Sequence, residues 1–234
     1  HCSFALVLSG CSLWYGTRPR CPLASLRSVA VLPVVGAPSG KEEEFGKILA
    51  SELVQFPGIE KIVLPRKTEY VRRTFGLDRN VVQDLRSLAK ELGVDGVLSA
   101  ELYDFDLHDP PRAVIWCALV TRKHNSKDPT YPLRLVRGAT MPESQKATPS
   151  GVWTLTRVFD AGAHSTSDDI VLYSLSREKP SYGLSRVERV TRIGSEFFRY
   201  VSDRTIRSLF YRIKEYGPYD RKKSIDRELV HREG

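Results

Sequence analysis

The sequence has no long hydrophobic run and few of the patterns that enzymes and metal sites require. None of its apolar segments approaches the ~20 residues that a membrane-spanning helix needs. The motifs G-x-S-x-G and H-E-x-x-H, a C-x-x-C pair and zinc-type Cys/His spacings are all absent. These gaps exclude a polytopic membrane protein and leave no recognisable nucleophile or general base. We therefore expect no catalytic residues, no metal and no cofactor.

The composition is that of a folded protein with a sizeable core. The chain has 234 residues, of which 41% are hydrophobic and 27% are charged. This length favours one domain with extensions, and this balance excludes wholesale disorder. Its 36 Lys and Arg outnumber its 28 Asp and Glu, which gives a formal net charge of +8. Such a charge permits an anionic partner without choosing among nucleic acid, lipid headgroups and wall polymer.

A short apolar segment near the start is followed by small residues and a cysteine. The sequence Leu8-Ser9-Gly10-Cys11 resembles a bacterial lipobox, in which signal peptidase cleaves before a cysteine that carries diacylglycerol. The alternative is a first core strand at 4–8 with an inert buried Cys11. Under the resemblance, residues 1–10 are the remnant of a signal peptide and Cys11 is the lipidation site. The next residue is Ser12 rather than Asp, which implies the outer membrane, on its periplasmic side.

Two of the remaining cysteines would stay in an oxidising compartment. Cys2 would leave with the signal peptide, whereas Cys21 and Cys117 would remain in the mature chain. A disulfide between Cys21 and Cys117 is one interpretation. Because Cys117 lies in an apolar run, a reduced buried thiol is equally natural there.

The hydrophobic pattern alternates between strand-like runs and helical stripes. Apolar runs predict strands at 28–35, 62–64, 94–107, 112–122, 133–136 and 151–159. Periodic apolar residues predict helices at 45–56, 66–75, 80–92, 165–176 and 184–216. The turn at Asp109-Pro110-Pro111 favours antiparallel pairing of the strands on either side of it. We therefore expect a lipidated tether at 11–27, one α/β domain at 28–217 and a charged tail at 218–234.

Two segments of this domain carry a resemblance to known envelope proteins. Val29-Ala30-Val31-Leu32-Pro33 precedes a helical stripe, and Leu88-Ala89-Lys90-Glu91-Leu92-Gly93-Val94-Asp95-Gly96-Val97-Leu98 follows later. This order resembles the amino-terminal domain of TolB and the body of the curli-secretion lipoprotein CsgG. The resemblance implies a single α/β (α+β) domain with a mixed β-sheet and flanking helices. It also implies work through protein contacts and self-assembly, with no catalytic residues.

Two local patterns are close to functional motifs but fit structural explanations better. The loop at 36–41 is one residue short of a phosphate-binding loop, and three glutamates follow it where phosphate would have to bind. The acidic cluster Asp104, Asp106, His108 and Asp109 alternates along one strand, where only two side chains could reach one ion. Helix initiation and a solvated strand edge explain these patterns.

The last quarter of the chain is strongly basic. Residues 177–234 contain 15 Lys and Arg against 9 Asp and Glu, so this region carries +6 of the total charge. Tyr200, Tyr211 and Tyr216 are interleaved with these cations, as in some surfaces that stack bases. A solvated helix face is the alternative explanation. The predicted contacts to an anionic surface are Arg186, Arg189, Arg192, Arg199, Arg207 and Lys214.

These observations favour a lipid-anchored bacterial envelope protein. We expect a non-enzymatic binding or assembly module, associated with secretion or with the wall. Its partners would be the membrane, other envelope proteins and further copies of the chain, but no nucleic acid. The main alternative is a soluble nucleic-acid-binding module that uses the basic C-terminal helix. A hydrolase that uses the acidic cluster at 104–109 is a third hypothesis.

Overall fold

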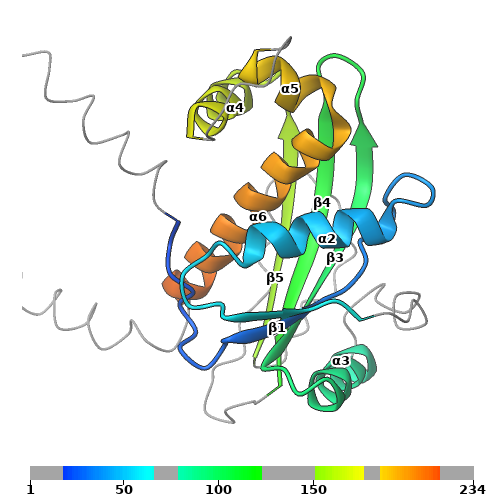
Figure 1. Ribbon diagram of the computed structural model, residues 1–234, viewed down its shortest axis with the longest axis vertical. Coiled ribbons are helices and arrows are strands. Elements are labelled where there is room, and N and C mark those ends of the chain that lie inside the picture. The colour runs from blue at the N-terminus through cyan, green and yellow to red at the C-terminus, as the bar shows by residue number, and fades with distance from the viewer. Residues whose placement is uncertain (1–17, 66–78, 123–150, 177–184, 217–234) are drawn as a thin grey trace, which may run out of the picture.

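Five strands form one mixed β-sheet in the order β2-β1-β3-β4-β5 (Figure 1). The computed structural model describes residues 18–65, 79–122, 151–176 and 185–216. Within them, β1 is parallel to β2 and β3, whereas β3, β4 and β5 pair antiparallel. The predicted α/β domain with a mixed sheet is therefore confirmed. The strands are β1 (Ser28–Val31), β2 (Lys61–Val63), β3 (Gly96–Asp106), β4 (Arg112–Thr121) and β5 (Val152–Asp160).

The five helices of the described ranges cover the two faces of this sheet unequally. Helix α3 packs on one face, and the other helices pack on the opposite face (Figure 1). The chain moves from β1 to β2 through α2, and then back past β1 to β3 through α3. Because parallel crossovers are right-handed, this reversal of direction places α2 and α3 on opposite faces. The helices are α2 (Glu42–Leu53), α3 (Arg79–Glu91), α4 (His164–Ser176), α5 (Arg186–Arg192) and α6 (Gly194–Tyr216).

Strand β1 shows how the sequence supplies both cores. Successive residues of a strand point to opposite faces, so a strand covered on both sides must be apolar throughout. Val29 and Val31 belong to the core beneath α2 and α6, whereas Ala30 and Leu32 belong to the core beneath α3. The run at 28–35 that predicted this strand is therefore explained by burial on both faces. The regular strand ends at Val31, earlier than expected, and Val35 forms only an isolated bridge to Glu101.

The helix predicted at 184–216 is two helices. Helix α5 starts with a capping box in which Ser185 and Glu188 bond to each other's backbone N–H groups. It ends at Ile193, whose backbone is extended, and α6 begins at Gly194. A Cβ atom at Gly194 would lie 2.7 Å from Cδ1 of the exposed Leu107 side chain, so α6 begins in close contact with the segment after β3. The extended backbone of Ile193 thus divides a segment that the periodicity alone treats as continuous.

Other predictions agree with the described elements or lie outside them. The antiparallel pairing across the turn at 109–111 is confirmed, and Gly93 has the left-handed φ of 63° expected after α3. The predicted helix at 66–75, the strand at 133–136, residues 1–10 and the tail at 218–234 lie outside the described residues. No helix in the described ranges has both the length and the apolar character needed to cross a membrane.

Asp95 fastens the starts of β1 and β3 together. Its Oδ2 accepts hydrogen bonds from Ser28 Oγ at 2.7 Å, from Ser28 N at 3.0 Å and from Arg27 N at 3.2 Å. Its own N–H donates to Ser28 Oγ at 3.0 Å. Burial opposes ionisation of the carboxyl, but these bonds and the nearby Arg122 guanidinium outweigh it and lower the pKa of Asp95. Asp95, in the second segment that carries the resemblance, therefore bonds the residue immediately before the first segment.

We expect replacement Asp95→Asn to reduce the pH dependence of stability. A carboxyl whose pKa is lowered by folding stabilises the protein fully above its unfolded pKa, which is near 3.8 for Asp95. This contribution is lost as the pH falls through the lower, folded pKa. Urea unfolding at several pH values should give a wild-type advantage over Asp95→Asn that is largest near neutral pH and shrinks in acid.

Ser28→Ala provides a second variant for the same measurement, because it removes the shortest hydrogen bond to the Asp95 carboxylate. Ser28→Ala should therefore lose less stability than the wild type when the pH is lowered, and it does so without changing the charge of the chain. Parallel loss of stability on acidification in the wild type and both variants would contradict the assignment.

Candidate functional site

The described part of the predicted tether is packed against the domain. Residues 18–27 contain no helix or strand, yet Cys21 and Leu26 are buried. The N–H of Cys21 donates to the carbonyl of Pro57 at 2.8 Å, in the loop after α2. The chain therefore docks on the body from Arg18 onward.

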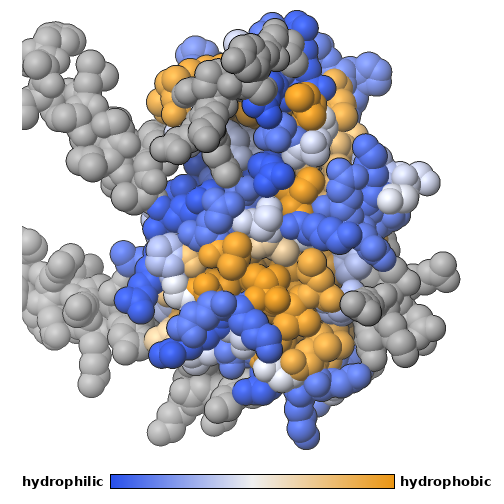
Figure 2. Space-filling model, in the orientation of Figure 1, coloured by the Kyte–Doolittle hydropathy of each residue, from blue (hydrophilic) through white to orange (hydrophobic). Residues whose placement is uncertain are grey.

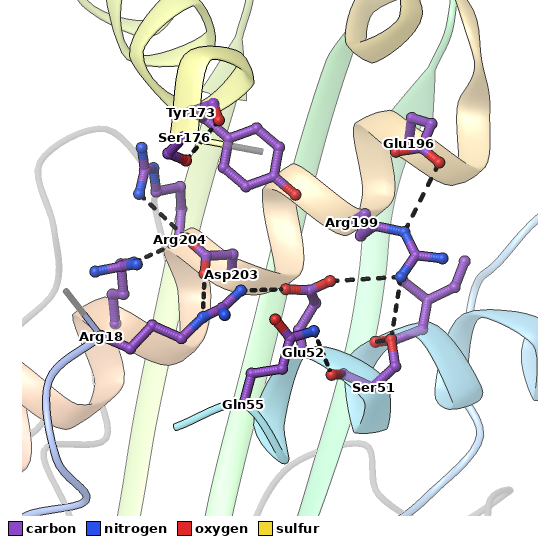
Figure 3. A network of polar contacts seen from close by, with 12 residues as sticks. Arg18, Ser51, Glu52, Gln55, Tyr173, Ser176, Glu196, Arg199, Asp203 and Arg204 are labelled. Carbon is purple, nitrogen blue, oxygen red and sulfur yellow. Dashed lines mark hydrogen bonds and ion pairs between the residues drawn. The ribbon is translucent and has the colours of Figure 1, made fainter. Parts of the chain in front are cut away.

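Arg18 forms the most substantial contact of this segment (Figure 3). Its Nη2 donates to Glu52 Oε2 at 3.0 Å, and its Nε donates to Asp203 Oδ1 at 3.2 Å. Glu52 is in the last turn of α2 and Asp203 is in the middle of α6. Both carboxylates are almost completely removed from solvent, with side-chain exposures of 0% and 1%. One arginine of the tether thus joins two helices through two buried carboxylates.

Three further arginines complete this network on α6. Arg199 Nη1 lies 3.5 Å from Glu52 Oε1, and Arg207 Nε lies 2.8 Å from Asp203 Oδ2. Arg204 bonds both Asp203 at 3.1 Å and Asp169 of α4 at 2.8 Å. The tether-docking network, as we call it, consists of Arg18, Glu52, Asp169, Arg199, Asp203, Arg204 and Arg207.

The arginines of the network compensate the negative charge of its carboxylates. Glu52 and Asp203 each have at least two arginine partners, and a buried carboxylate needs such partners to remain charged. Carboxylates held in this way are poorly placed to accept a proton from a substrate or to ligate a cation. Arg18 and Arg207 also lie over the Phe56 ring, at 5.5 Å and 5.7 Å from its centroid. The site is suited to holding the tether.

Helical spacing explains why charged residues lie inside the core here. Glu52 follows the buried Ile48 by four residues and precedes the buried Phe56 by four, so it lies on the apolar face of α2. Asp203 lies in the stretch 200–206 of α6, every residue of which is buried. Neither residue was predicted from the sequence. An acid within an apolar stripe was the available signal, but the sequence did not show which arginines would meet it.

The predicted anionic-surface contacts do not form one open basic face. Arg199 and Arg207 turn toward the buried carboxylates Glu52 and Asp203, which corrects the prediction for these two residues. Arg192 pairs with Glu188 at 3.8 Å, Arg189 is half-buried and Lys214 is exposed. The side chain of Arg186 lies outside the description.

Tyr200 is also placed differently from the expectation that it could stack a base. It is buried, and its hydroxyl donates to Asp169 at 2.9 Å. Burial, together with the neighbouring Asp169 carboxylate, raises the pKa of Tyr200 well above its usual range. This ring belongs to the core.

The predicted disulfide between Cys21 and Cys117 is not formed in the structure. Both are free, buried thiols. Cys21 lies beside Gly58, a residue of the loop after α2. Cys117 lies within β4, where its strand-register partners are Ala100 of β3 and Leu155 of β5. Cys11 and Cys2 lie outside the described residues.

The acidic cluster at 104–109 forms local pairs on the exposed end of the sheet. Asp104 lies 3.7 Å from the guanidinium of Arg112, and Asp106 contacts the ring and the N–H of His108. In the part of the chain that the structure describes, no three His, Cys, Asp or Glu side chains are placed to hold a metal ion.

Comparison with known proteins gives distant structural similarity only. No model of a protein family and no curated protein matches the sequence. The PelC dodecamer from Paraburkholderia phytofirmans is 14% identical over 76% of this chain and 94% of its own, with a TM-score of 0.31. The hypothetical protein CT253 from Chlamydia trachomatis is 16% identical over 82% of this chain and 97% of its own, with a TM-score of 0.42. Similarity at this level does not indicate what this chain binds.

Replacement Arg18→Ala should destabilise the folded domain, because it removes one partner from two buried carboxylates. Removing one member of a buried ion pair costs about 3–5 kcal/mol, and the remaining arginines of the network should reduce this to about 2–3 kcal/mol. Urea denaturation followed by circular dichroism measures the difference.

Arg20→Ala is the matched control, since Arg20 is two residues away and exposed. This variant should change stability by less than about 0.5 kcal/mol. Equal effects of Arg18→Ala and Arg20→Ala would show that the docking of Arg18 contributes nothing.

The two buried thiols should resist alkylation while the protein is folded. Burial raises the pKa of Cys21 to about 11 and that of Cys117 to about 12, so neither forms much thiolate near neutral pH. In a chain with Cys2→Ser and Cys11→Ser, mass spectrometry after treatment with N-ethylmaleimide should detect no adduct. The same treatment in guanidinium chloride should add two. Rapid modification of the native protein would contradict the placement of these thiols.

Proposed function

We propose that this chain is a lipid-anchored protein of the bacterial cell envelope, whose body binds or assembles other envelope components without catalysing a reaction. The observation that carries the proposal is the short path from lipobox to body. Leu8-Ser9-Gly10-Cys11 is followed, seven residues after the cysteine, by Arg18, which is fixed to two buried carboxylates. A lipid on Cys11 would therefore be coupled to a firmly docked segment.

Acylation provides a strong membrane anchor without a spanning helix. Each buried methylene contributes about 0.8 kcal/mol, so two or three acyl chains would hold the protein on a bilayer almost permanently. Ser12 after the cysteine supports delivery to the outer membrane, with the body on its periplasmic side. The polar, folded body would then remain in the aqueous compartment.

The surface of the body offers places where protein partners could bind. In the described part of the sheet, β2 and β5 are the edge strands, and an edge strand can pair with a strand of another chain. Figure 2 shows apolar residues gathered below α2, on the side of the molecule where β2 lies. Leu64, directly after β2, and Val54, directly after α2, are 42% and 47% exposed. These features support binding to envelope proteins and to further copies of the chain.

The placement of the basic residues favours this proposal over nucleic-acid binding. Arg199 and Arg207 are engaged with internal carboxylates, and Tyr200 is buried. Phosphate contacts and base stacking both require such groups on an accessible surface. The basic charge of α6 is thus partly used to balance the charge of the core.

Lipidation is tested by metabolic labelling with an alkyne analogue of palmitate, followed by membrane fractionation. The wild-type chain, expressed behind the signal peptide of a known lipoprotein, should carry the label and sediment with membranes. Cys11→Ala should lose the label and leave the membrane fraction, because no other residue could accept the diacylglycerol at this site.

Cys2→Ala is the matched control, because Cys2 lies in the segment that the signal peptidase would remove. This variant should behave as the wild type does. Absence of label from the wild type, or label retained by Cys11→Ala, would refute the proposal.

A further inference from the structure

We propose that one end of the body faces the bilayer and that its exposed cations contact anionic lipid headgroups. This anchor end consists of residues 18–27, the loop at 54–60, the start of β2 and the last turns of α6. The orientation of the body rests on the proposed lipidation of Cys11. The contact between its exposed cations and the headgroups can be tested without the lipid.

The segments of the anchor end are held together by direct contacts. The carbonyl of Arg27 accepts from the N–H of Glu60 at 2.7 Å and from that of Lys61 at 3.1 Å. The Phe56 ring packs edge-on against Phe210 of α6, with centroids 5.3 Å apart. Figure 1 shows the start of the described chain crossing the C-terminal part of α6, beside the loop between α2 and β2. Arg18 thus enters the body where these segments meet.

Covalent length limits how far this end can lie from the membrane. Arg18 follows Cys11 by 18 − 11 = 7 residues, a segment that can extend to at most about 25 Å. A domain of this size has a diameter of about 40 Å. Because Arg18 is fixed by Glu52 and Asp203, a lipid on Cys11 stays within about 25 Å of Arg18, and the bilayer then lies on the side of the body where the chain enters.

The charge of the anchor end suits an anionic surface. Its exposed cations are Arg20, Arg27, Lys61 and Lys214, and its exposed acids are Glu60 and Glu215. Arg27 and Glu60 lie 3.6 Å apart and largely compensate each other. A lysine or arginine near an anionic membrane strengthens binding about fivefold. Arg20, Lys61 and Lys214 are therefore the three cations expected to contact headgroups.

The β3–β4 turn provides a reference point away from the anchor end. Strand β3 begins beside Asp95, which bonds Arg27 and Ser28, and it extends over 11 residues. An extended strand of this length spans about 35 Å. His108, in the turn after β3, has a fully accessible side chain with 95% exposure. Lys61 and His108 therefore lie at opposite ends of the body.

Orientation is tested with the lipidated chain reconstituted in vesicles of phosphatidylcholine and phosphatidylglycerol. Lys61→Cys or His108→Cys carries a fluorophore, and Cys21 and Cys117 are buried. A nitroxide on the lipid headgroups should quench the label at position 61 and leave the label at position 108 bright. Equal quenching at both positions, or stronger quenching at 108, would overturn the proposed orientation.

Failure of lipidation has a different signature. A chain without acyl groups lacks their added mass and shows no membrane label in the fractionation experiment. That result would refute the proposed anchor, and with it the orientation that depends on the anchor.

The charge component is tested with the full chain carrying Cys11→Ser. In flotation at low salt, this chain should bind vesicles with one third phosphatidylglycerol more tightly than vesicles of pure phosphatidylcholine. Replacing Arg20, Lys61 and Lys214 by Gln should weaken binding about fivefold for each cation. The matched control replaces Lys41, Arg112 and Arg192, three exposed cations outside the anchor end, by Gln.

The control has the same net charge as the test variant, so it separates a local contact from a general effect of charge. Its affinity should stay close to that of the parent chain. Equal losses in the two variants, or equal binding to both kinds of vesicle, would overturn the headgroup contact. All six positions are exposed, so circular dichroism should show the same fold in both variants.

Discussion

The ion pairs of Arg18 with Glu52 and Asp203 are the interaction on which the rest of the structure depends. Two carboxylates with almost no solvent access would be very unfavourable without cationic partners. The network meets this requirement with four arginines, one from the tether and three from α6. It joins α2 to α6 in the same place where the chain enters the body. The position of the tether is therefore part of the fold.

The docking of Arg18 would limit how the body can move relative to the proposed lipid on Cys11. A long tether would let the body rotate freely beside a membrane, whereas a lipidated Cys11 only seven residues before the fixed Arg18 would not. The proposed anchor would then present one end of the domain, including the start of β2, to the lipid and keep the opposite edge strand, β5, available to partners. Binding of the body at the membrane would follow from geometry alone, without a catalytic group.

Much of the fold could be predicted because its signals are local. The apolar run at 28–35 predicted a strand buried on both faces, and the stripes at 45–56 and 80–92 predicted α2 and α3. The candidate site was harder to predict, because Glu52 and Asp203 lie within apolar stripes and their partners come from other segments. The break at Ile193 was missed because the spacing of apolar residues does not reveal a single residue with an extended backbone.

The sequence by itself determined the types and order of the elements, since the spacing of apolar residues reflects which faces a helix or strand must bury. It also supplied the lipobox resemblance at Cys11, which depends on four consecutive residues. Only the tertiary structure decided which charges pair. Arg18 meets one carboxylate 34 residues away and another 185 residues away, in a chain that offers 36 cations and 28 acids. Charged residues, unlike apolar ones, have no regular spacing that identifies their partners. The ion pairs become defined only when packing brings distant helices together.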